Sequence, residues 1–124
     1  MTTTLHRGLT VVTASAAALA IWVIAVPGLG LDLAVRQGAA RTVVNPASVL
    51  AASLVAGLIA WGLVAGLERL TPRARIAWRT SAVVALVLSL SGPLFGGVSA
   101  AATAVLVLMH LVVGGILLAW LAPR

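Results

Sequence analysis

With 124 residues, 62% of them hydrophobic and 8% charged, the chain has too few polar side chains to cover a water-soluble fold, in which about 25% of residues are charged. Composition therefore predicts a single integral membrane domain over residues 1–124. The formal charge of +6 comes from eight arginines against two acids. Beside apolar segments, we expect these arginines to set orientation and to contact membrane lipids rather than nucleic acid.

The absence of cysteine excludes disulfides and thiolate metal sites. Two histidines and two acids are too few for a buried multi-ligand metal centre. The sequence shows no nucleophile–base pair of the kind that catalysis needs. We therefore expect no cofactor, no metal and no enzyme activity.

Four apolar segments approach the roughly 20 residues that a helix needs to cross the hydrocarbon core. The predicted spans are about 9–28, 47–67, 76–93 and 99–121. A cleavable signal peptide would share the basic start of the first span, but its apolar run is long for one, and we expect an uncleaved helix. The stretch SGPLFGG, residues 91–97, is expected to turn the chain between the third and fourth spans.

The segment between the first two spans alternates in hydropathy. It reads LDLAVR at 31–36, then QGAA, then RTVV at 41–44, which predicts a short β-hairpin, with a flexible loop as the alternative. Because an isolated hairpin is marginal in water, its apolar face must rest on helix ends or lipid. The predicted fold class is an all-α membrane protein, a four-transmembrane-helix up-down-up-down bundle with a short extracytoplasmic β-hairpin.

The placement of arginines predicts the orientation. Six of them lie at one end of the expected bundle and two at the other, and the arginine-rich side is the cytoplasmic one. We expect a multi-pass plasma-membrane protein with both termini cytoplasmic. Glu68 is expected to form a solvated ion pair with Arg69. The residues assigned to the membrane surface are Arg69, Arg73, Arg75, Arg79 and Trp78.

Small residues predict where helices meet, because they allow membrane helices to approach closely. Gly62 and Gly66 form a GxxxG motif in the second span, and Ala85 belongs to a stripe of small residues in the third. We expect these residues to pack within one bundle. A GxxxG face also permits a homo-oligomer or a partner membrane protein.

One histidine, His110, lies near the middle of the fourth span. Ionisable residues inside a membrane are candidates for function, but no acid stands at a comparable depth to continue a proton route. We therefore favour a structural role, with a neutral imidazole bonded to a water or to a serine of another helix (Ser15, Ser53 or Ser89). Such a bond contributes about 0.6 kcal/mol, and up to about 2 kcal/mol.

Several motifs carry a family resemblance: Arg7-Gly8, LDLAVR, LER at 67–69, LSGPL at 90–94 and above all ATAVLVLMHLVVGGIL at 102–117. Together they resemble a family of small, uncharacterised actinobacterial membrane proteins with a domain of unknown function. The resemblance implies an actinobacterial plasma membrane and four helices. It implies no activity.

Two functions remain open at this point. The favoured one is a non-enzymatic membrane component that binds a lipid, an apolar ligand or a partner protein. The alternative is a small oligomeric transporter or channel in which His110 titrates. A polar cavity joining His110, Ser53 and Ser89 to one membrane face would favour transport, whereas a dry, closed bundle with an exposed groove would favour binding.

Overall fold

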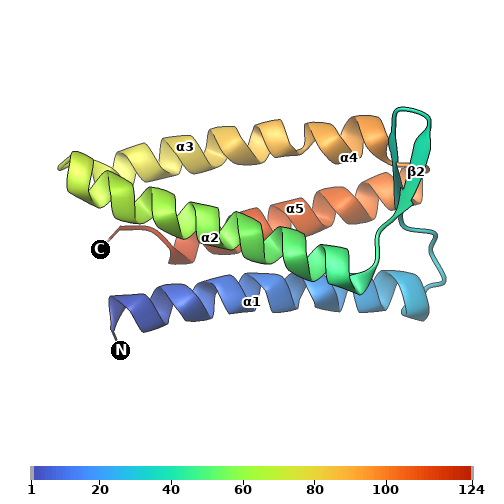
Figure 1. Cartoon of the computed structure of the whole chain (residues 1–124), viewed down its shortest axis with the longest axis horizontal. Helices are drawn as coiled ribbons and strands as arrows, with labels where there is room; N and C mark the ends of the chain where they lie inside the picture. The colour runs from blue at the N-terminus through green and yellow to red at the C-terminus, as the bar shows by residue number, and fades with distance from the viewer. Residues whose placement is uncertain (1, 124) are drawn as a thin grey trace.

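The computed structural model describes residues 2–123, and its four long helices lie along one axis (Figure 1). They are α1 (Thr3–Val23), which the π-helical turn η1 (Ile24–Gly28) extends, α2 (Pro46–Leu70), α3 (Ala74–Ser89) and α5 (Ala100–Trp120). With their extensions, all four are long and apolar enough to span a membrane. The start of α1 and the end of α5 lie together at one end, termed the terminal end, opposite a hairpin end.

The stretch expected to turn the chain is helical instead. A short helix, α4 (Ser91–Gly96), follows α3 directly through Leu90, so the predicted turn is wrong there. Pro93 has no N–H to offer the carbonyl of Ser89, which breaks the hydrogen-bond ladder without ending the helical path. The chain leaves the helix only at Gly97, which has extended dihedral angles.

The predicted hairpin is confirmed. Strand β1 (Ala34–Gln37) pairs with the antiparallel strand β2 (Ala40–Val43). Gly38 begins the connecting turn at φ 64°, the position at which a tight type II′ turn takes glycine. The apolar side of the segment rests on the bundle, since Leu33 is buried in the core and Val35, two residues later on the same face, packs against it.

The buried core divides into two clusters along the long axis. The cluster at the hairpin end comprises Ala18, Leu33, Val49, Ala102, Leu106 and Met109. The cluster at the terminal end comprises Ala14, Val64, Trp78, Leu117 and Leu121. Among these buried residues, α3 contributes only Trp78, so the core is built mainly by α1, α2 and α5.

A close contact of α1 with α2 occurs at a glycine outside the GxxxG motif. A Cβ built on Gly57 would lie 2.7 Å from Cγ1 of Val11, whereas one built on Gly62 or Gly66 would meet nothing within 4 Å in the described part of the chain. The prediction that Gly62 and Gly66 pack within the bundle is therefore wrong. At about 100° per residue, both lie on the side of α2 away from Gly57.

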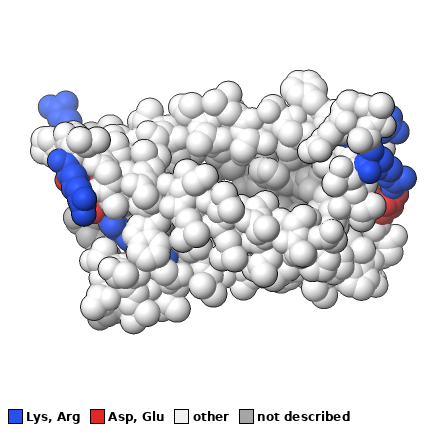
Figure 2. Space-filling view, viewed as in Figure 1, with Lys and Arg blue, Asp and Glu red and all other residues white. Residues whose placement is uncertain are grey.

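Charged side chains gather at the two ends and leave an uncharged band between them (Figure 2), as in a membrane protein. At the terminal end Arg7 is buried, with its side chain 8% exposed, and pairs with Glu68. This pair across α1 and α2 replaces the predicted Glu68–Arg69 pair. At the hairpin end Arg41 pairs with Asp32, and both are well exposed. Arg124, counted with the terminal-end arginines, lies outside the described residues.

Candidate functional site

A groove of about 760 Å³ runs along one side of the bundle between α2 and α3, with α5 as its floor. The two helices are adjacent at the terminal end and diverge toward the hairpin end (Figure 1), where the hairpin and α4 complete the lining. Figure 2 shows the surface hollowed in this region. The wall on α2 extends from Ser48 to Leu63, about 22 Å of helix, which is most of the roughly 30 Å hydrocarbon core.

The wall on α3 is the stripe of small residues that the sequence assigns to helix packing. Ser81, Ala85 and Ser89 line the groove at intervals of one helical turn, and Ala85 and Ser89 are exposed. The prediction that Ala85 packs on a neighbouring helix is therefore wrong. Leu86 of α3 instead packs against α5, since its Cδ1 would lie 2.6 Å from a Cβ on Gly114.

Three of the four predicted polar residues line this groove, namely His110, Ser53 and Ser89. The fourth, Ser15, is buried and lies outside the lining. Each of the four bonds a carbonyl three or four residues earlier in its own helix. For His110 this carbonyl is that of Leu106, 2.7 Å from Nδ1, so the predicted bond to a serine of another helix is wrong.

The bond to Leu106 determines what His110 can offer a ligand. A carbonyl oxygen only accepts, so Nδ1 carries a proton and donates it. In a neutral imidazole the other nitrogen, Nε2, is then an acceptor. His110 thus places one polar atom for recognition in a groove whose other α5 residues are apolar.

The residues assigned to the membrane surface separate into two groups. The arginines are exposed near the terminal end, at positions Arg69, Arg73, Arg75 and Arg79. Trp78 is instead only 2% exposed, so it packs inside the bundle, and its position at the depth of the membrane surface stays a prediction. Its indole N–H donates to the carbonyl of Leu118 at 3.1 Å, because the last carbonyls of a helix have no intrahelical partner and a buried indole needs an acceptor. Trp78 lines the groove at its narrow end.

Two polar residues of β1, Arg36 and Gln37, line the wide end of the groove. Sequence reasoning used Arg36 only for orientation. In residues 2–123 the two carboxylates both pair with other arginines, Asp32 with Arg41 and Glu68 with Arg7. Arg36 is therefore a cation without an acidic partner among the described residues. The sequence signal for unpaired cations is the excess of eight arginines over two acids.

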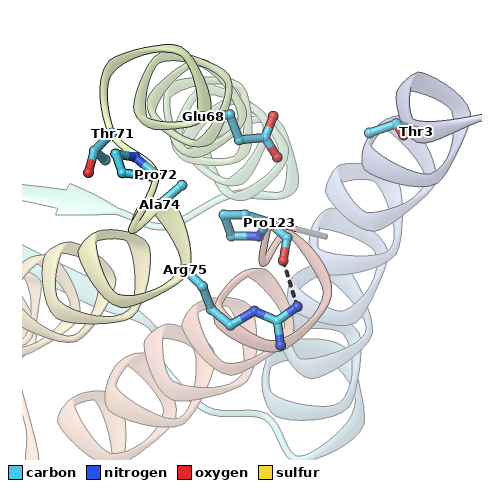
Figure 3. Close-up of a pocket in the computed structure, with 7 residues that line it drawn as sticks. All are labelled: Thr3, Glu68, Thr71, Pro72, Ala74, Arg75 and Pro123. Carbon is cyan, nitrogen blue, oxygen red and sulfur yellow. Dashed lines mark hydrogen bonds between the residues drawn. The ribbon is translucent and has the colours of Figure 1, made fainter.

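A second hollow of about 550 Å³ lies at the terminal end, lined by Thr3, Glu68, Thr71, Pro72, Ala74, Arg75 and Pro123 (Figure 3). Arg75 donates to the carbonyl of Pro123 at 3.0 Å, drawn as a dashed line. Glu68 is already paired with Arg7. Since both charged groups have partners within the protein, this hollow offers a ligand fewer free polar groups than the groove does.

Comparison with known proteins identifies a family. One family model matches residues 1–124, that of a family of unknown function (DUF6069). The chain belongs to this family. No curated protein and no solved structure matches it. The resemblance to a family of unknown function is thereby confirmed, and the actinobacterial origin stays a prediction.

In this DUF6069 protein, no three His, Cys, Asp or Glu side chains among the described residues come together as a metal site requires. Most residues that line its groove are apolar, and the one charged lining residue in the described part of the chain, Arg36, lies at the wide end beside Gln37. The arrangement suits the binding of an elongated, mostly apolar molecule.

Proposed function

We propose that the protein is a non-enzymatic component of the plasma membrane, with both termini cytoplasmic, that binds the acyl chain of a membrane lipid between α2 and α3. The observation that carries the proposal is the groove, which is long, mostly apolar and open at the side. Residues of its α2 wall such as Ala52, Ala56 and Ile59 are exposed. A chain can therefore enter from the bilayer without any helix moving.

Packing physics favours an acyl chain as the occupant. Within a bilayer the hydrophobic effect does not drive association, and close van der Waals contact does. The small residues of both walls, Ala52 and Ala56 on one side and Ser81 and Ala85 on the other, let a chain approach the backbone. The volume of about 760 Å³ lies within the range of about 300–1,000 Å³ typical of small-molecule sites.

The test fills the groove and counts bound lipid. Ala56→Trp places an indole in the middle of the α2 wall. Gly62→Trp places the same indole about 120° around α2 from Ala56, outside the groove lining, where a Cβ meets nothing within 4 Å among the described residues. Native mass spectrometry of the detergent-purified protein measures the fraction that retains lipid. We expect the wild type and Gly62→Trp to retain it and Ala56→Trp to lose most of it.

Circular dichroism of each variant verifies that the helices are intact. Equal retention by the two tryptophan variants would contradict the proposal, as would a wild type that retains no lipid.

A transporter or channel in which His110 titrates is the second candidate. One observation favours it, that the groove brings His110 together with Ser53 and Ser89. NMR titration of labelled histidine tests it, with His110→Gln to assign the signal and His6 as the control. Titration of His110 between about pH 5 and pH 8, in exchange with bulk water, would indicate a hydrated path to this depth. A His110 signal that does not change with pH would leave lipid binding as the one remaining candidate function.

A further inference from the structure

We infer that the lipid held in the groove is anionic and that Arg36 binds its headgroup at the hairpin end. The inference rests on the proposed acyl-chain function and adds the class of lipid and the direction in which it lies. It assigns Arg36 a role in recognition beyond orientation of the protein in the membrane.

Charge is the first argument. Arg36 lines the wide end of the groove and is exposed. Its cross-strand neighbour is a second arginine, Arg41, and directly opposed like charges are unfavourable. Asp32 neutralises Arg41, which leaves the hairpin with a net positive charge at Arg36. An anion placed there would supply the missing counter-charge.

The chemistry of the side chains is the second argument. A guanidinium presents N–H donors in a planar fork that matches the oxygens of a phosphate, and such charge-assisted bonds are stronger than neutral ones. Gln37 lines the same end of the groove and carries an amide that donates two further N–H groups. A phosphate-bearing headgroup therefore finds charge and donors together at this end.

The shape of the groove sets the direction of the lipid. Its narrow end lies between the converging α2 and α3 (Figure 1), where Trp78 is buried and bonded to α5. Its wide end lies at the hairpin, beside Arg36. The headgroup therefore lies at the hairpin and the chain extends toward Trp78. With the orientation that the arginines predict, this lipid belongs to the extracytoplasmic leaflet.

The experiment compares headgroups with identical chains. The full-length protein is reconstituted in nanodiscs that contain equal amounts of phosphatidylglycerol and phosphatidylcholine, and native mass spectrometry measures which lipid it retains. We expect the wild type to prefer phosphatidylglycerol. Arg36→Gln should lower that preference about fivefold, the effect of one cation at a membrane surface, without lowering the total lipid retained. Arg36→Lys should keep most of the preference.

Arg69→Gln is the matched control, because it removes the same charge from an exposed arginine at the terminal end. An equal loss of preference in Arg69→Gln would overturn the inference, since the effect would then belong to overall charge. Retention without preference in the wild type, or an unchanged preference in Arg36→Gln, would also overturn it and leave the proposed function intact. Absence of retained lipid in the wild type would instead contradict the proposed function.

Discussion

The helices α1 and α3 both pack on α2 and α5, but only α1 packs tightly. In the most apolar part of α1, 33% of the residues are buried, compared with 6% in that of α3. Val11 of α1 fits against Gly57 of α2, so that a branched side chain meets an open backbone. Between α2 and α3 small residues face small residues, and the helices diverge toward the hairpin. Small residues allow two helices to pack closely where a larger side chain of the facing helix fills the space beside them. Where small residues face small residues, a groove remains.

The largest expected effect lies on the tightly packed side. Glu68→Gln removes the partner of Arg7, whose side chain is 8% exposed, and a buried charge left unpaired is costly. We expect a loss of about 3 kcal/mol of unfolding free energy, at the low end of values for buried pairs because Glu68 itself is partly exposed. Denaturant titration in micelles measures the loss.

Asp32→Asn is the control for that variant, because its pair with Arg41 is well exposed at both ends. We expect it to cost no more than about 1 kcal/mol. Equal losses in the two variants would mean that the pair of α1 with α2 is no more buried than the pair at the hairpin.

The next effect tests the contact between Val11 and Gly57 directly. In Gly57→Leu the new Cβ would lie 2.7 Å from Cγ1 of Val11, so α1 and α2 must move apart. We expect a loss of about 1–3 kcal/mol from overpacking, measured by thermal unfolding. Gly62→Leu on the same helix should lose nothing, since leucine favours the helix over glycine. A loss in Gly62→Leu as large as that in Gly57→Leu would contradict the assigned faces of α2.

A smaller effect concerns the attachment of α3. Trp78→Phe keeps an aromatic ring in the terminal-end cluster but removes the N–H bonded to Leu118. We expect a loss of about 1 kcal/mol of unfolding free energy. Relative to the wild type, amide hydrogen exchange should become faster in α3 and change less in α1. Trp120→Phe, at a tryptophan that is 53% exposed, should change neither. Unchanged exchange in α3 would show that Trp78 does not hold the helix in place.

The four apolar helices and the hairpin were predictable because their signals are local. Length and hydropathy identify a span, and the alternation around Gly38 identifies the strands. The helical path through Pro93 was harder to predict, because SGPLFGG has the composition of a turn. The end of α4 lies against β1, with Val35 bridged to Gly97 just after the helix ends, and no local pattern encodes that contact.

The groove was only partly predictable, because hydropathy inside a membrane does not reveal which side of a helix faces its neighbours. Gly62 and Gly66 satisfy a packing motif, yet a Cβ added at either would meet nothing within 4 Å among the described residues, whereas Gly57 makes the contact with α1. Three of the four predicted polar residues do share one site, but their bonds stay within their own helices. Glu68 pairs with a residue 61 positions away, which only the fold brings near.

The smallest change in stability is expected for a substitution in the groove between α2 and α3. This substitution distinguishes an effect on lipid binding from an effect on stability. Ala85→Leu adds a larger side chain to an exposed position on the α3 wall, so nothing has to move, and unfolding free energy should stay within about 0.5 kcal/mol of the wild type. The added side chain nevertheless occupies space that the acyl chain would need, so lipid retention in native mass spectrometry should fall. Val84→Leu, one residue earlier on α3 at an exposed position outside the groove lining, should keep both stability and retention. A marked loss of stability in Ala85→Leu would mean that α3 closes on α2 as α1 does, and the contrast between the two sides of the bundle would disappear.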